Sequence, residues 1–133
     1  MPQRIVLDTS AYAQLRRGHP DVQLRIARSD NTVVPAIVLG ELEAGFRCGS
    51  RYKENTTVLE EFLSEPFVTT LAVDVAVSRI YGRHLAALRR AGTPIPTNDI
   101  WIAACATSVG APLVTFDTHF TKVSDLDLDL LQA

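Results

Sequence analysis

Short apolar segments that alternate with amphipathic segments are the feature that most constrains the fold of this chain. The apolar segments, typical of buried strands, are 4–7, 32–35, 67–73, 113–116 and 126–131. Segments with the apolar spacing of helices start at Asp8 and cover 20–28, 37–48, 52–64, 74–90 and 97–109. Strands that alternate with helices predict an α/β fold, a three-layer α/β/α sandwich with a mostly parallel central sheet.

Residues at the ends of these segments support the same order of elements. Asp8, Thr9 and Ser10 are helix-capping types that directly follow the first apolar segment, and Thr97 is expected to cap the last helix. Gly92 is expected to end the long helix that starts at Asp74. In the last segment leucine alternates with aspartate, which is typical of a half-exposed edge strand.

Composition places the chain among ordinary globular proteins. Of its 133 residues 47% are hydrophobic and 21% are charged, and we find no repeat, linker or low-complexity tract. We therefore expect a single domain over residues 1–133. The first residues lack a signal peptide's apolar core, and no apolar run approaches the roughly 18 residues of a membrane span. We expect a cytoplasmic protein with no membrane contact.

Charge and cysteine content exclude two simple classes of function. The net charge is 13 − 15 = −2, so the strongly basic balance of an ordinary nucleic-acid-binding domain is missing. Cys48 and Cys105 lie far apart in the sequence, with no CxxC pair and no histidine at ligand spacing. They are expected to be reduced thiols, and a zinc site is not expected.

Four acidic residues stand where a parallel sheet places its ligands. Asp8 and Asp117 directly follow predicted strands, Glu41 lies about one turn into a helix that follows another strand, and Asp99 lies in the first turn of the last helix. Ligands of open parallel sheets bind beyond the carboxyl ends of the strands. Free N–H groups at helix starts favour ionised carboxylates there.

Four carboxylates at one place would repel one another unless a divalent cation lay between them. Oxygen ligands without cysteine or histidine favour Mg²⁺, with Mn²⁺ as the alternative. The competing interpretation is that each acid is only a helix cap or a surface group at the end of a strand. The spacing of the residues leaves both interpretations open.

Four segments resemble the signature regions of a known family. They are IVLDTSAY (5–12), VLGELEAG (38–45), TNDIWIAACA (97–106) and LVTFDTHF (113–120), and they resemble those of PIN-domain nucleases, in particular the VapC-type toxins of bacterial toxin–antitoxin pairs. The resemblance implies a PIN-like fold and identifies Asp8, Glu41, Asp99 and Asp117 as catalytic, metal-binding residues. It also identifies a supporting set that would hold these carboxylates in place, namely Thr9, Ser10, Asn98 and Thr115.

The resemblance implies an activity and partners as well. The expected activity is Mg²⁺-dependent hydrolysis of RNA by an activated water, which leaves a 5′-phosphate and a 3′-hydroxyl. The expected partners are an RNA substrate, a cognate VapB-like antitoxin and a second copy of the chain in a homodimer. A non-catalytic PIN-like module that binds RNA or protein is the alternative. A phosphotransfer domain that uses Asp8 is disfavoured because Ser10 replaces the second aspartate of a DxD pair.

Other residues are candidates for RNA or protein contacts. Eleven of the 13 basic residues are arginines, which bind phosphate through paired hydrogen bonds. The basic residues considered to flank the site are Arg16, Arg17, Arg25, Arg28, Arg47, Arg51 and Lys53. Tyr12 and Phe46 are candidates for stacking on bases, with core packing as the alternative, and His119 is expected to be a hydrogen-bonded loop residue. The apolar residues considered for a protein interface are Val38, Leu42, Phe46, Val58, Phe62 and Leu63.

Overall fold

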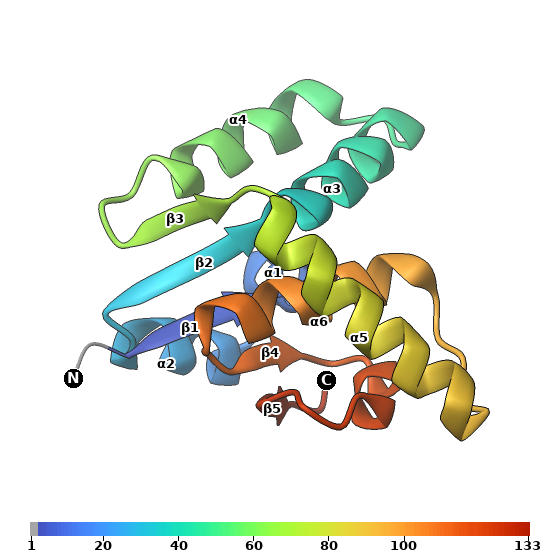
Figure 1. The fold of residues 1–133 in the computed structure, drawn as a ribbon. Coiled ribbons are helices and arrows are strands. Elements are labelled where there is room, and N and C mark those ends of the chain that lie inside the picture. Colours follow the sequence, from blue (N-terminus) through green and yellow to red (C-terminus); the bar gives the residue numbers. More distant parts are fainter. Residues whose placement is uncertain (1–2) are drawn as a thin grey trace.

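The computed structural model describes residues 3–133 and contains a five-stranded sheet between helices (Figure 1). The strands are β1 (Arg4–Leu7), β2 (Asn31–Pro35), β3 (Val68–Leu71), β4 (Leu113–Thr115) and β5 (Leu128–Leu130). The helices are α1 (Thr9–Arg16), α2 (Pro20–Arg28), α3 (Ala36–Cys48), α4 (Tyr52–Leu63), α5 (Val75–Ala91) and α6 (Thr97–Val109), with a 3₁₀ helix, η1 (Thr118–Lys122). The first two residues of the expected domain lie outside this description.

The sheet is parallel throughout, with β1 at its centre. Its strand order is β3-β2-β1-β4-β5, and β1 pairs with β2 through Val6 and Val33 and with β4 through Leu7 and Val114. The remaining pairs, β2 with β3 and β4 with β5, are also parallel. All carboxyl ends therefore lie at one edge of the sheet, and the predicted α/β class with a mostly parallel sheet is confirmed.

The two faces of the sheet carry separate parts of the core. Because side chains alternate along a strand, Val6 and Leu113 pack in a cluster that includes Ile100 and Phe120, whereas Leu7 packs in a second cluster. That second cluster holds residues of β1, β4, α1 and α2. Figure 1 shows α5 and α6 on one face of the sheet and α1 and α2 on the other, which is the expected three-layer arrangement.

Several boundaries differ from those expected. The expected strand 67–73 is shortened to β3, and the last strand is only three residues long, although it does lie at the edge of the sheet. Thr97 is the first residue of α6 rather than its cap, since Pro96 takes the cap position and offers no side-chain hydrogen bond. The sequence did not predict η1. Gly92 does end α5, in the left-handed conformation that glycine adopts most readily.

The structure also revises the proposed protein interface. Val38 and Leu42 are buried in the core, and Phe46, Phe62 and Leu63 pack against it. Core packing, the alternative to a protein interface, therefore accounts for these residues. Both cysteines are free as expected, and burial raises the pKa of the Cys105 thiol to about 11. None of the helices in residues 3–133 is long and apolar enough to cross a bilayer.

The position of β4 next to the central strand β1 gives a test of the fold. Leu113 is fully buried and Leu24 is 40% exposed on α2. Leu113→Ala should lower the free energy of unfolding by about 2 to 5 kcal/mol, because it leaves a cavity beside the central strand. Leu24→Ala is the matched control and should change it by only about 0.5 kcal/mol. Urea denaturation followed by circular dichroism measures both, and equal effects would contradict the described core.

Candidate functional site

Asp8 is held in one position by three hydrogen-bond donors, two from α1 and one from β4. It follows β1 directly and caps α1, where its carboxylate accepts a hydrogen bond from the Ala11 amide at 2.8 Å. The hydroxyls of Ser10 and Thr115 donate to the same carboxylate at 2.8 and 2.5 Å. Asp8 is only 3% exposed, and burial raises its pKa although these three donors act in the opposite direction.

The same two hydroxyls connect Asp8 to the segment that carries Asp117. Thr115 Oγ1 accepts a hydrogen bond from the Asp117 amide at 3.0 Å, and Ser10 Oγ accepts one from the Phe116 amide at 3.0 Å. The segment after β4 is thereby fixed against the start of α1. Two acids that are separated by more than 100 residues in the sequence share one small network of hydrogen bonds.

Glu41 comes from α3 and is tied to two other helices. The Thr9 hydroxyl of α1 donates to its Oε1 at 2.6 Å, and the Asn98 amide of α6 donates to its Oε2 at 3.4 Å. The proposed supporting residues Thr9, Ser10, Asn98 and Thr115 thus each donate a hydrogen bond to one of the four acids.

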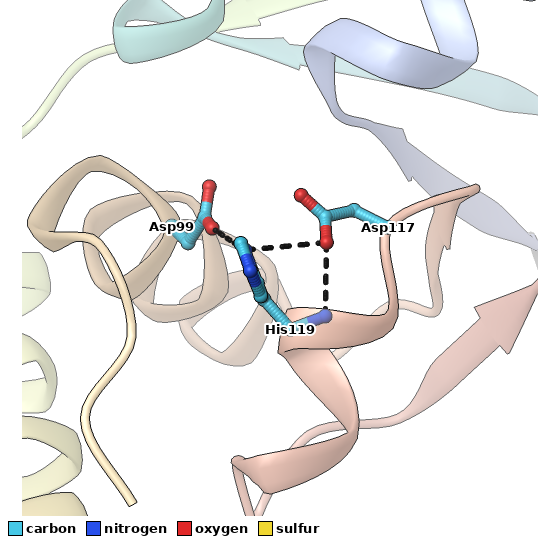
Figure 2. A group of neighbouring side chains, drawn as sticks. All are labelled: Asp99, Asp117 and His119. Carbon is cyan, nitrogen blue, oxygen red and sulfur yellow. Dashed lines mark hydrogen bonds and ion pairs between the residues drawn. The ribbon is translucent and has the colours of Figure 1, made fainter.

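His119 lies between two of the acids, as Figure 2 shows. Its Nδ1 is 3.0 Å from Asp99 Oδ2 and 3.3 Å from Asp117 Oδ1, and its backbone amide donates to Asp117 Oδ1 at 2.9 Å. One ligand atom from each of these three residues lies within 4.8 Å of the others, so they form a group that could hold a metal ion.

One oxygen of each aspartate in this group remains available. Among residues 3–133 no hydrogen-bond donor reaches Asp99 Oδ1 or Asp117 Oδ2. In Figure 2 both of these oxygens point away from His119 and to the same side. Two carboxylate oxygens are therefore open to a cation.

All four acids line one hollow at the carboxyl edge of the sheet. Its volume is about 300 Å³, and its walls are Asp8, Thr9, Ser10, Ala13, Glu41, Asp99, Ile102 and Asp117. We call it the acidic hollow. Burial is the main cause that raises the pKa of Asp99, and the charges of Asp117 and Glu41 raise it further against the opposing effect of His119. Negative charge is concentrated here to a degree that favours a bound cation.

The sequence placed the four acids at the correct edge but did not predict the contacts of His119. The segment DTHF (117–120) shows that His119 lies two residues after Asp117. Asp99 and His119 are 20 residues apart in the sequence, so no local pattern predicts their contact. The closest group consists of Asp99, Asp117 and His119, and Asp8 and Glu41 complete the walls of the acidic hollow.

Several of the residues considered for RNA contacts have partners within the chain. Arg25 pairs with Asp129 at 2.6 Å, and Arg47 pairs with Glu43 at 2.5 Å, which is the alternative role of a surface arginine in an ion pair. Tyr12 is 2% exposed and packs against Phe62, which leaves no face for a base. Arg16 and Arg17 remain candidates, because they line a hollow of about 320 Å³ that shares Ala13 with the acidic hollow.

Curated relatives and solved structures match nearly the whole chain. Ribonuclease VapC4 of Mycobacterium tuberculosis is 30% identical over 128 residues, which cover 95% of each chain. Ribonuclease VapC1 of Haemophilus influenzae is 29% identical over 126 residues, which cover 91% of this chain and 92% of the relative. A solved structure of VapBC-1 from nontypeable Haemophilus influenzae superimposes with a TM-score of 0.86 at 26% identity, covering 96% of this chain and 98% of that one.

A family model gives the assignment directly. The model of the PIN domain matches residues 5–126, a range that contains all four acids of the acidic hollow. The chain therefore belongs to the PIN domain family.

Proposed function

We propose that this chain is a metal-dependent endoribonuclease that acts as the toxin of a type II toxin–antitoxin pair. The observation that carries the proposal is the convergence of four carboxylates on one hollow, with an unbonded oxygen on Asp99 and on Asp117. The ribonuclease names of relatives that match most of the chain support the same activity.

The residues of the acidic hollow fit a hard divalent cation. Carboxylate oxygens are the preferred protein ligands of Mg²⁺ and Mn²⁺, and these ions retain several waters when they bind to proteins. A hollow of about 300 Å³ leaves room for such waters beside the four acids. We propose Mg²⁺ as the ion, with Mn²⁺ as a substitute, and Asp8, Asp99, Glu41 and Asp117 as the residues that hold it directly or through water.

Such an ion, when bound, lowers the pKa of water and offsets negative charge on a phosphodiester. The residues of the chain fix the positions of the carboxylates that would hold the ion. Asp8 is fixed by three hydrogen bonds, and Glu41 is fixed by Thr9 and Asn98, so both carboxylates are preorganised. His119 holds Asp99 and Asp117 on one side and leaves their other oxygens free. Without a cation, these charges would repel the phosphate of a substrate.

Water rather than the ribose hydroxyl is the proposed attacking group. The four carboxylates surround a space large enough for water, and no serine or cysteine nucleophile is required by this chemistry. The products should therefore carry a 5′-phosphate and a 3′-hydroxyl. The proposed catalytic residues are Asp8, Glu41, Asp99 and Asp117.

The proposed partners follow from the relatives. VapBC-1 from Haemophilus influenzae is a named pair, and its structure covers nearly the whole of this chain. We therefore propose a VapB-like antitoxin as the inhibitor of this chain. We also propose a homodimer as its assembly and the cytoplasm as its location. The alternative, a PIN-like module that binds RNA or protein without cleaving it, gains no support from the site, since all four acids are present and share one hollow.

Cleavage of RNA tests the proposed activity. With Mg²⁺ or Mn²⁺ the chain should cut transfer RNA or a single-stranded oligoribonucleotide, and EDTA should abolish the reaction. Asp8→Asn and Asp99→Asn should each lower kcat/KM by more than about 100-fold, because loss of a group that merely supports a metal ligand already costs roughly 10- to 100-fold. Gel electrophoresis and end-group analysis of the products measure rate and chemistry.

Asp21→Asn is the matched control for these variants, since Asp21 is exposed on α2 and does not line the acidic hollow. It should retain full activity. Full cleavage in EDTA would refute the metal mechanism. Tight RNA binding by the wild-type chain without any cleavage would instead favour the non-catalytic module.

The raised pKa of Asp99 gives a separate prediction about stability. The folded state binds the Asp99 proton more tightly than the unfolded state does, so this carboxyl destabilises the metal-free fold as pH rises above its ordinary pKa of 3.8. In EDTA at neutral pH, Asp99→Asn should therefore be more stable than the wild type, and the difference should shrink toward low pH.

Addition of Mn²⁺ at neutral pH should make the wild type more stable than Asp99→Asn. An ion that binds only the folded state stabilises it, by about 2.7 kcal/mol at 100 times its dissociation constant, and Asp99→Asn should lose most of that gain. Thermal unfolding at several pH values measures both effects. Equal stabilisation of the two proteins by Mn²⁺ would contradict a role for Asp99 in holding the ion.

A further inference from the structure

Helix α5 carries the most one-sided charge in the structure. Its 17 residues include four arginines and neither aspartate nor glutamate. The four arginines, Arg79, Arg83, Arg89 and Arg90, are all exposed. The chain as a whole carries a net charge of −2, so this helix is a local reversal of the overall balance.

Three of these arginines form a row along the helix. Arg79, Arg83 and Arg90 follow one another at i, i+4 and i+11, which places them within about 40° of one line and across about 16 Å of an α-helix. We call these three residues the arginine row. Arg89 lies outside this line, roughly 80° from Arg79 around the axis.

The arginine row borders a hollow of about 550 Å³ between α5 and the segment after η1. Ser124 and Asp125 form part of the opposite wall, and Asp125 is the single acid among the lining residues. His84 also lines this hollow, but it contacts the Thr107 hydroxyl at 3.1 Å and burial lowers its pKa, so it adds no positive charge at neutral pH. The three arginines therefore outnumber the acid, and the hollow is positively charged.

The guanidinium groups of the arginine row have no partner in the described part of the chain. Within residues 3–133 the ion pairs of arginine are those of Arg25 with Asp129 and of Arg47 with Glu43. The three arginines thus keep all their N–H donors available to a ligand. Arginine binds phosphate through two parallel hydrogen bonds, which makes a phosphate-bearing ligand the best chemical match.

The end of the arginine row is close in sequence to one acid of the acidic hollow. Arg90 lies in the last turn of α5, and a short loop joins α5 to α6, whose first turn carries Asp99. The opposite wall of the positive hollow is the segment that continues from η1, which itself starts directly after Asp117. In Figure 1, α5 and α6 run side by side in opposite directions.

We propose that the arginine row binds backbone phosphates of an RNA strand that extends from the acidic hollow along α5. The inference rests on the proposed ribonuclease function and adds a contact surface outside the acidic hollow. It explains how a chain of negative net charge holds a polyanion: the acids are concentrated in one hollow, and the unpaired arginines lie along another. Contacts of this kind are independent of base sequence and sensitive to salt.

Salt-dependent binding tests the proposal without requiring catalysis. In EDTA, fluorescence anisotropy of a labelled single-stranded RNA gives the dissociation constant of the full chain at several salt concentrations. Each phosphate contact contributes about 0.7 to the slope of log affinity against log salt for single strands. The variant R79Q/R83Q/R90Q should therefore lose about 2 from that slope and bind more weakly at low salt.

Arg89→Gln is the matched control, because Arg89 is an exposed arginine of the same helix that does not line the positive hollow. It should keep the wild-type slope, and both variants should keep the wild-type circular dichroism spectrum, since glutamine is a good helix former. An unchanged slope in the triple variant would overturn the proposal and leave the arginine row to a different class of partner, such as an acidic protein segment.

Cleavage kinetics separate this proposal from the proposed function. On a long RNA the triple variant should show a raised KM with an unchanged kcat. A dinucleotide, whose single phosphodiester must occupy the acidic hollow, should be cleaved as by the wild type. Absence of cleavage by the wild-type chain would refute the proposed function alone, because the binding experiment would still test the arginine row. Normal wild-type cleavage with an equal KM for wild type and triple variant would refute the arginine row alone.

Discussion

The site depends on the hydrogen bond between Thr115 and Asp8, which joins the ends of the two central strands. Pairing of Leu7 with Val114 aligns β1 and β4. The residues next in sequence to this pair, Asp8 and Thr115, therefore come together at the carboxyl edge of the sheet. Because Thr115 Oγ1 also accepts from the Asp117 amide, one hydroxyl sets the position of two acids. The other two acids, Glu41 and Asp99, lie on α3 and α6, and both helices contribute residues to the hydrophobic core.

Concentrating acids in this way destabilises the fold unless other groups offset the charge. Asp8 gains three hydrogen bonds at the start of α1, and Asp99 lies in the first turn of α6, where free N–H groups favour negative charge. Burial nevertheless raises the pKa of both aspartates. The compensation is therefore incomplete, which agrees with the proposed binding of a cation at this site. The unpaired arginines of α5 line a different hollow and are not among the groups that contact these acids.

The sequence predicted the helices and strands that are set by the periodicity of apolar residues. It did not predict individual side-chain contacts between distant segments. Apolar runs and capping residues located β1, β2, β4 and all six helices, and the position after each strand located Asp8 and Asp117. The predicted ends of strands were less accurate. For β3, the strand extends only as far as its pairing with β2, which the composition of the segment does not reveal. The contact of His119 with Asp99, and the pairing of Arg25 with Asp129, join distant segments and leave no local signal.

The central claim of the proposed function is that Asp8, Glu41, Asp99 and Asp117 together hold divalent metal, as one ion or two, in the acidic hollow. Anomalous diffraction from crystals of the full chain soaked in Mn²⁺ tests it most directly. The account predicts a manganese peak within the acidic hollow, with Asp99 Oδ1 or Asp117 Oδ2 among its ligands. Saturating Mn²⁺ that leaves the acidic hollow without a peak, or that binds only at other surface carboxylates, would contradict it.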